Sequence, residues 1–201
     1  MTKRFAQAAG RNAGAILEVL RVEFASCRAV LEIGSGSGQH AVYFSQHLTW
    51  LKWQPSDVAQ YVDGIKAWVA DAETPNLLEP RTIDVRADEC PGPEFDAVFS
   101  ANTAHIMHQD AVAAMFRLVS RTLPPGGSFV LYGPIRQRGR YNTESNAVFD
   151  RSLQQRDPGM GLRDIEFLDE LATQEKMQRV RVYAMPANNH IVVWTNSGEG
   201  V

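Results

Sequence analysis

Cysteine, long apolar runs and a surplus of basic residues are all scarce in this sequence of 201 residues. Two cysteines, Cys27 and Cys90, are too few for a disulfide framework, and no apolar run approaches the roughly 20 residues that cross a bilayer. Lys and Arg number 20 against 23 Asp and Glu, so the basic excess typical of duplex nucleic-acid binders is absent. Residues 1–11 lack the apolar core of a secretory signal, and we therefore expect a cytoplasmic protein without membrane association.

Length and composition indicate one globular domain over residues 1–201. Hydrophobic residues make up 44% and charged residues 21%, which fits neither a disordered nor a fibrous chain. Short apolar runs alternate with helical patterns through the first two-thirds, which predicts parallel strands joined by crossover helices. We expect these strands at residues 29–33, 50–53, 81–85, 96–99 and 128–132.

Helical periodicity and the last third of the chain complete the predicted fold. Apolar residues recur at helical spacing within 58–69 and 112–123, and an earlier stripe predicts an N-terminal helix at about residues 11–25. Two strand patterns, 179–184 and 191–194, are separated only by residues 185–190; so short a link suits an antiparallel hairpin. The sequence thus predicts an α/β fold with a seven-stranded, mostly parallel sheet, an antiparallel terminal hairpin and helices on both faces.

The stretch "VLEIGSGSGQH" places alternating glycines directly after the first predicted strand. Gly34, Gly36 and Gly38 leave bare backbone amides at the start of a helix, where a ligand can approach without meeting a Cβ atom. A dinucleotide-binding loop needs a third glycine at the position of Gln39, so the spacing argues against NAD. Glu32, two residues before the first glycine, favours a cationic ligand and would repel a pyrophosphate.

These residues resemble the first motif of class I S-adenosylmethionine (SAM)-dependent methyltransferases. The resemblance implies a Rossmann-like fold and SAM as cofactor, with S-adenosylhomocysteine (SAH) as its product. It also implies that Asp57 binds the ribose, that Asp84 contacts the adenine, and that Asn102 lies over the reaction centre at the end of the fourth strand. A narrower set of motifs resembles an uncharacterised methyltransferase-like family, a domain of unknown function: "RN" at 11–12, "WQPSD" at 53–57, "LYGP" at 131–134, "SNAVFD" at 145–150, "GLRD" at 161–164 and "MPANN" at 185–189.

Several of these residues have a second, structural interpretation. Asp57 precedes a predicted helix and could be the N-cap of that helix, the residue that binds the ribose of the cofactor, or both. Arg11 and Asn12 either start the first helix at the surface or bind the methionyl carboxylate of the cofactor. His40 and His47 read as ordinary positions on the short helix after the glycines. His105 and His108 lack a third ligand, so we expect no metal site.

The reaction centre is expected around the fourth and fifth strands. Asn102 would face the transferred methyl group, and His105 or Asp150 would accept a proton, although His105 could equally be a buried structural histidine. Residues 133–163 would form a lid over the strand ends, where open α/β sheets bind ligands, or else a surface excursion over the sheet edge. We expect substrate contacts from Tyr132, Tyr141, Asn146, Phe149, Asn188 and Asn189.

Three functions compete at this stage. The favoured one is a SAM-dependent methyltransferase acting on a small-molecule acceptor by direct in-line transfer. The second is a non-catalytic protein that binds SAM or SAH as a regulatory or scaffold subunit. The third, a NAD-dependent oxidoreductase, is disfavoured by Gln39. Nucleic-acid methylation is disfavoured because the sequence after Asn102 is "TAH", without a stacking aromatic; the oligomeric state is not indicated.

Overall fold

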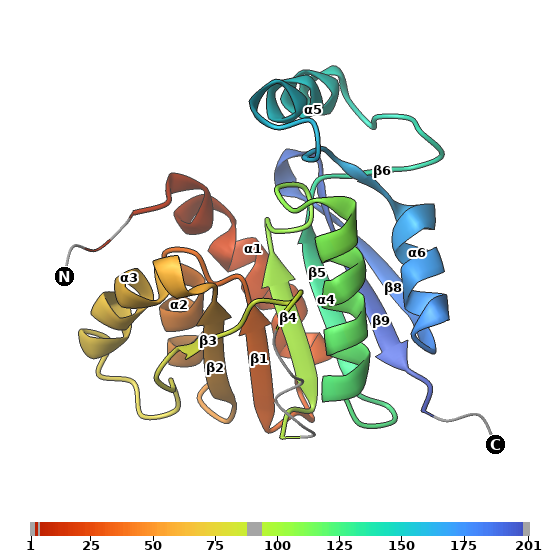
Figure 1. Ribbon diagram of the computed structural model, residues 1–201. Coiled ribbons are helices and arrows are strands. Elements are labelled where there is room, and N and C mark those ends of the chain that lie inside the picture. The colour runs from red at the N-terminus through yellow and green to blue at the C-terminus, as the bar shows by residue number, and fades with distance from the viewer. Residues whose placement is uncertain (1–2, 4, 88–93, 199–201) are drawn as a thin grey trace.

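The computed structural model describes residues 3, 5–87 and 94–198. Helices and strands alternate along the chain and form a layered α/β architecture (Figure 1). The elements are α1 (Gln7–Glu23), β1 (Ala29–Ile33), α2 (Gln39–His47), β2 (Lys52–Asp57), α3 (Ala59–Ala70), β3 (Arg81–Thr82), β4 (Ala97–Ala101), α4 (Gln109–Thr122), β5 (Ser128–Gly133), β6 (Ile135–Arg136), α5 (Glu144–Arg156), β7 (Arg163–Asp164), α6 (Ile165–Gln174), β8 (Met177–Met185), the 3-10 helix η1 (Pro186–Asn188) and β9 (Asn189–Asn196).

The main sheet has seven strands in the order β3-β2-β1-β4-β5-β9-β8. The five strands from β3 to β5 pair in parallel, whereas β9 runs antiparallel to both β5 and β8. The predicted fold class and the terminal hairpin are confirmed. Because β1 lies between β2 and β4, the chain reverses its direction of winding there, and the ends of β1 and β4 form the switch point at which such sheets bind ligands.

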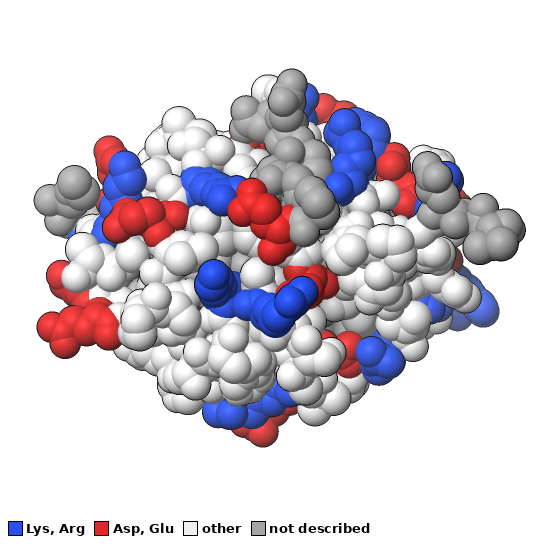
Figure 2. All heavy atoms as spheres, turned by 90° about the horizontal axis from the view of Figure 1, so that it is seen from below, with Lys and Arg blue, Asp and Glu red and all other residues white. Residues whose placement is uncertain are grey.

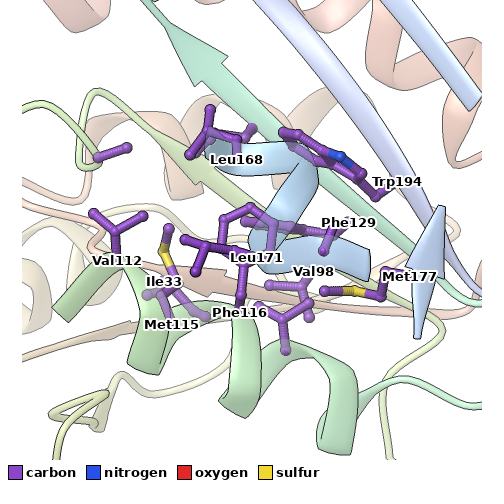
Figure 3. Packing of buried hydrophobic residues seen from close by; sticks show 14 of the residues in the cluster. Ile33, Val98, Val112, Met115, Phe116, Phe129, Leu168, Leu171, Met177 and Trp194 are labelled. Atoms are coloured by element: carbon purple, nitrogen blue, oxygen red, sulfur yellow. The ribbon is translucent and has the colours of Figure 1, made fainter. Parts of the chain in front are cut away.

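Two apolar clusters hold the helices on the sheet. One lies between the sheet and the pair α4 and α6; its ring cluster of Phe116, Phe129 and Trp194 appears in Figure 3. Phe129 on β5 contacts the ring of Phe116 at 5.3 Å and that of Trp194 at 5.7 Å. The second cluster joins the opposite face to α1 and α2, with α3 beside α2. Helices thus cover both faces of the sheet, and the end at which the parallel strands finish is where a site is expected.

Several predicted element boundaries differ from those of the structure, and three of them are instructive. The second strand is β2 at Lys52–Asp57, not 50–53, and it includes Pro55; this residue pairs with Glu32 of β1, while the ladder with β3 begins only at Ser56, so the missing N–H costs no sheet bond. The third strand ends at Thr82. The first helix begins at Gln7 and not at about residue 11. The prediction missed its first turns because they are rich in alanine and carry no apolar stripe.

Residues between β5 and α6 form a separate layer above the sheet. β6 and β7 pair in a small parallel sheet, and α5 stands over the edge at which β1, β4 and β5 end (Figure 1). This is the segment, residues 133–163, for which the sequence predicts a lid.

The opposite edge of the sheet carries charges of both signs. Lys and Arg side chains are interspersed with Asp and Glu where the parallel strands begin (Figure 2). No helix among the described residues combines the length and apolar character needed to cross a membrane.

Replacement of Phe129 by alanine tests the ring cluster. Phe129 is fully buried, so F129A should lower the free energy of unfolding by about 3 to 5 kcal/mol, measured by urea denaturation. V148A, at a side chain that is 52% exposed, is the control and should change it by less than about 0.5 kcal/mol. Equal stability of the two variants would contradict this assignment of the core.

Candidate cofactor and transfer site

The glycine loop follows β1, and its three alternating glycines have positive φ angles of 74° (Gly34), 59° (Gly36) and 88° (Gly38). A Cβ atom on Gly34 would lie 2.4 Å from Cγ2 of Thr103, and one on Gly38 would lie 3.2 Å from Cα of Ile65. A Cβ atom on Gly36 would meet nothing within 4 Å. Gly34 and Gly38 therefore fit the loop against the protein, while Gly36 presents bare backbone to open space.

Asp57 joins this loop to the end of β2. Its Oδ2 accepts a hydrogen bond from the Gly36 amide at 2.7 Å, and the Ser56 carbonyl beside it accepts from the amides of Gly34 and Ser35 at 2.9 Å. Burial raises the pKa of Asp57, an effect opposed by the hydrogen bonds from Gly36 and Val58. The N-cap of α3 is Val58, so the interpretation of Asp57 as the helix cap is wrong. The carboxylate instead lies at the edge of the loop, where it can also accept from the hydroxyl groups of a ligand.

Glu32 lies behind the loop, not on its surface. Its side chain is 1% exposed, and a carboxylate oxygen accepts a hydrogen bond from Nε1 of Trp53 at 2.9 Å. Burial raises the pKa of Glu32 to about 7, although hydrogen bonds from Trp53 and Ser35 act in the opposite direction. This carboxyl group can therefore change its charge near neutral pH in response to a charged ligand.

The sheet brings two further predicted cofactor residues to the same edge. Asp84 follows β3 and is half-buried; its Oδ1 accepts from the Arg86 amide at 3.0 Å. Asn102 follows β4 with a φ of 60°, and its backbone N–H donates to the Tyr132 carbonyl at 2.9 Å. The glycine loop, Asp57, Asp84 and Asn102 consequently line the ends of four adjacent strands.

The first helix contributes Asn12 to this edge. Asn12 Oδ1 lies 2.8 Å from Nε2 of His40, and its side chain also hydrogen-bonds with the Tyr132 hydroxyl, so one amide links α1, α2 and β5. Arg11, next to it on α1, is exposed. A guanidinium on this exposed turn remains a predicted, untested contact for a carboxylate.

His40 is not the ordinary helix position that the sequence suggested. It is 7% exposed and stacks on Phe44 at 5.2 Å, and burial lowers its pKa to about 4, against a hydrogen bond with the Ala9 backbone that raises it. A neutral imidazole therefore lies one turn from the glycine loop. Its place two residues after Gly38 was the one signal in the sequence that could have identified it.

His105 lies in the loop between β4 and α4, below the predicted lid. Its imidazole contacts the ring of Phe149 edge-on at 5.4 Å, and within the described chain no hydrogen bond to the imidazole occurs. Burial, and then the positive charge of Arg163, lower its pKa to about 4. Phe149 is 38% exposed and Ile106 is 45% exposed, so apolar side chains flank this neutral histidine at the surface.

Asp150 and Tyr141 bind each other. Asp150 is fully buried, and its oxygens accept hydrogen bonds from the Tyr141 hydroxyl at 2.6 Å, the Leu162 amide at 2.6 Å and Gln154 Nε2 at 3.2 Å. Arg136 lies 3.7 Å from the same carboxylate. These contacts stabilise the segment of residues 133–163 internally and give no support to Asp150 as a proton acceptor.

The predicted asparagines join the lid to the terminal hairpin. The side-chain amides of Asn142 and Asn146 donate to the Asn188 carbonyl at 3.1 and 3.2 Å, and Asn188 Nδ2 donates to Ser145 Oγ at 3.3 Å. Asn189 donates within its own turn, to Pro186 and Ala187. Ala187 and Asn188 both have positive φ, near 55° and 60°, so this turn is held in a strained conformation.

Solved structures with the same fold match over most of this chain. They include the S-adenosylmethionine-dependent methyltransferase SibL in its apo form (TM-score 0.80, 16% identity), an O-methyltransferase family 2 protein from Planctomyces limnophilus DSM 3776 in complex with apigenin (0.81, 17%) and PigF with SAH (0.79, 15%). The matches cover 94%, 94% and 92% of this chain but 55%, 58% and 56% of those chains, so the protein spans little more than half their length. At such identities the likeness establishes the fold.

The family comparison covers nearly the whole chain. Residues 3–196 match the family described as "Protein of unknown function (DUF938)", in agreement with the resemblance noted from the short motifs. The chain therefore belongs to this uncharacterised family and has the class I methyltransferase fold.

Proposed function

We propose that the protein is a SAM-dependent methyltransferase whose acceptor is a small molecule. The observation that carries this proposal is the open backbone at Gly36, whose amide is held by the Asp57 carboxylate at 2.7 Å. A glycine loop at the switch point, with carboxyl groups behind it and beside it, suits a cationic ligand that carries a sugar. SibL is a SAM-dependent methyltransferase, and PigF was solved with SAH, which supports the same cofactor here.

The residues present fit this cofactor. Asp57 would accept hydrogen bonds from the ribose, Asp84 would lie toward the adenine, and Glu32 would balance the positive charge from behind the loop. Arg11 and Asn12 on α1 would bind the methionyl end. Bound SAM would supply a methyl group on a positively charged sulfur, which an acceptor atom can displace without a covalent enzyme intermediate.

The protein's part in transfer would be alignment and exclusion of water, which can contribute roughly 7 to 11 kcal/mol in favourable cases. Asn102 and the backbone beside it would face the methyl group. The neutral imidazole of His105, which has no hydrogen-bond partner among the described residues, would accept a proton from the acceptor. Phe149 and Ile106 would provide apolar contact for a small acceptor. The walls of the acceptor pocket would be formed by Tyr132, Tyr141, Asn146, Asn188 and Asn189.

Calorimetric titration with SAM, SAH and NAD tests the cofactor, and transfer of a labelled methyl group from SAM to metabolites of a cell extract tests the activity. We expect binding of SAM and SAH, weaker or no binding of NAD, and labelling of a small molecule. Binding without labelling would favour a regulatory SAM-binding protein, and tighter binding of NAD would refute the proposal.

A matched pair of glycine substitutions tests the loop. G36A and G126A each introduce a methyl group at positive φ in open space, so each should cost about 1 to 2 kcal/mol of stability. Gly126 lies in the turn before β5, where the parallel strands begin and not where they end. Only G36A should weaken SAM binding, by at least about tenfold, since its methyl group fills the space expected for the cofactor. Equal SAM affinities for the two variants would rule out this position for the ligand.

The raised pKa of Glu32 predicts that SAM binding depends on pH. Because its pKa in the free protein is about 7, a cation bound in front of the loop should lower that pKa and release a proton. SAM affinity should therefore increase between pH 6 and pH 8 more steeply in the wild type than in E32Q. Calorimetry in two buffers of different ionisation enthalpy counts the released protons; the same count for both proteins would show that Glu32 does not sense the ligand.

A further inference from the structure

Arg163, the first residue of β7, is a buried cation whose hydrogen bonds all go to main-chain carbonyls. It is 7% exposed; Nε donates to Ala104 O at 3.1 Å, and Nη2 donates to Gly159 O at 2.8 Å and to Met107 O. Among the described residues no carboxylate forms an ion pair with it, although Asp150 lies close enough to raise its pKa against the lowering effect of burial. Burying a guanidinium without a paired anion is costly, so its retention calls for a reason other than stability.

Two of the three carbonyls that Arg163 binds belong to the loop that carries His105. Ala104 and Met107 flank this histidine, and the His105 carbonyl itself accepts from the Gly161 amide at 2.9 Å. Segment 161–163 is fixed in turn from the other side, because the Leu162 amide donates to the buried Asp150. The lid and the transfer loop are thus joined through three carbonyls of the loop.

The same guanidinium is part of the surroundings of the imidazole. His105, Arg163 and Tyr132 line one small cavity, together with Gly133, Pro134 and Leu168. Of the other ionisable groups nearby, His190 on β9 pairs with Gly133 and has a pKa lowered by burial, and Asp150 on α5 is occupied by its own donors. Arg163 is therefore the one fixed positive charge among the residues that line this cavity.

We propose that Arg163 is a positioning residue of the transfer site, which holds the loop of residues 104–107 against the lid so that the imidazole of His105 faces the acceptor. This inference rests on the proposed function. The planar guanidinium offers a rigid set of donors that can bind carbonyls of two segments at once, which a lysine cannot reproduce. The charge has a second effect, since it disfavours a proton on His105 and so helps to keep the imidazole neutral.

Two substitutions separate the geometry from the charge. R163K keeps the charge and loses the set of donors, whereas R163Q loses both. Both variants should lower kcat for methyl transfer by about ten- to a hundredfold, while SAM affinity stays unchanged. Only R163Q should raise the pKa of His105 from about 4 toward 6.5. NMR titration of histidine-labelled protein measures this pKa, and the H105Q variant assigns the signal. R151Q is the control, because Arg151 pairs with Glu144 on the exposed side of α5, and it should change neither quantity.

A folded R163Q protein with the wild-type kcat and the wild-type His105 pKa would overturn the proposal. If R163Q does not fold, R163K decides: a reduced kcat at unchanged His105 pKa supports the positioning role, and a wild-type kcat refutes it. The histidine titration needs no cofactor. A wild-type protein that neither binds SAM nor transfers methyl groups would therefore refute the proposed function, while the effect of Arg163 on His105 would still be measured.

Discussion

The candidate site depends on one hydrogen bond, in which the Gly36 amide donates to the Asp57 carboxylate. It ties the loop after β1 to the end of β2, and the Ser56 carbonyl supports it by accepting from the Gly34 and Ser35 amides. The loop can make these bonds only with positive φ angles, which glycine adopts without strain. Backbone conformation and ligand access are thus satisfied by the same residues.

The predicted lid, residues 133–163, depends on a different kind of contact. Apolar packing holds α4 and α6 on the sheet, whereas α5 is attached chiefly through polar groups: buried Asp150 within the lid, Arg163 toward the transfer loop, and Asn146 toward the hairpin. Polar attachments are directional, because a hydrogen bond weakens steeply when its donor and acceptor are misaligned. The segment above the site is therefore fixed in orientation without being part of the core.

The sequence predicted the sheet, its hairpin and the glycine loop because each has a local signal: apolar runs of strand length, a link too short for a crossover, and alternating glycines. It predicted β2 poorly because the apolar run ends at Trp53, and Gln54, Pro55 and Ser56 do not continue it. Pro55 is tolerated in the strand because the ladder with β3 begins only at Ser56. His40 and Arg163 were missed as site residues because burial and contacts across about 30 to 60 positions decide their roles. Asp150 was one of two candidate proton acceptors in the sequence, and its hydrogen bonds with Tyr141, Gln154 and Leu162 are contacts that no sequence pattern reveals.

Inserting β9 antiparallel between β5 and β8 brings the hairpin turn to the edge at which the parallel strands end, so that Asn188 reaches α5. Segments about 40 residues apart therefore share one surface. Within the family, the length and residues of the 186–189 turn should covary with those at the start of α5, and an insertion in one should be accompanied by a change in the other.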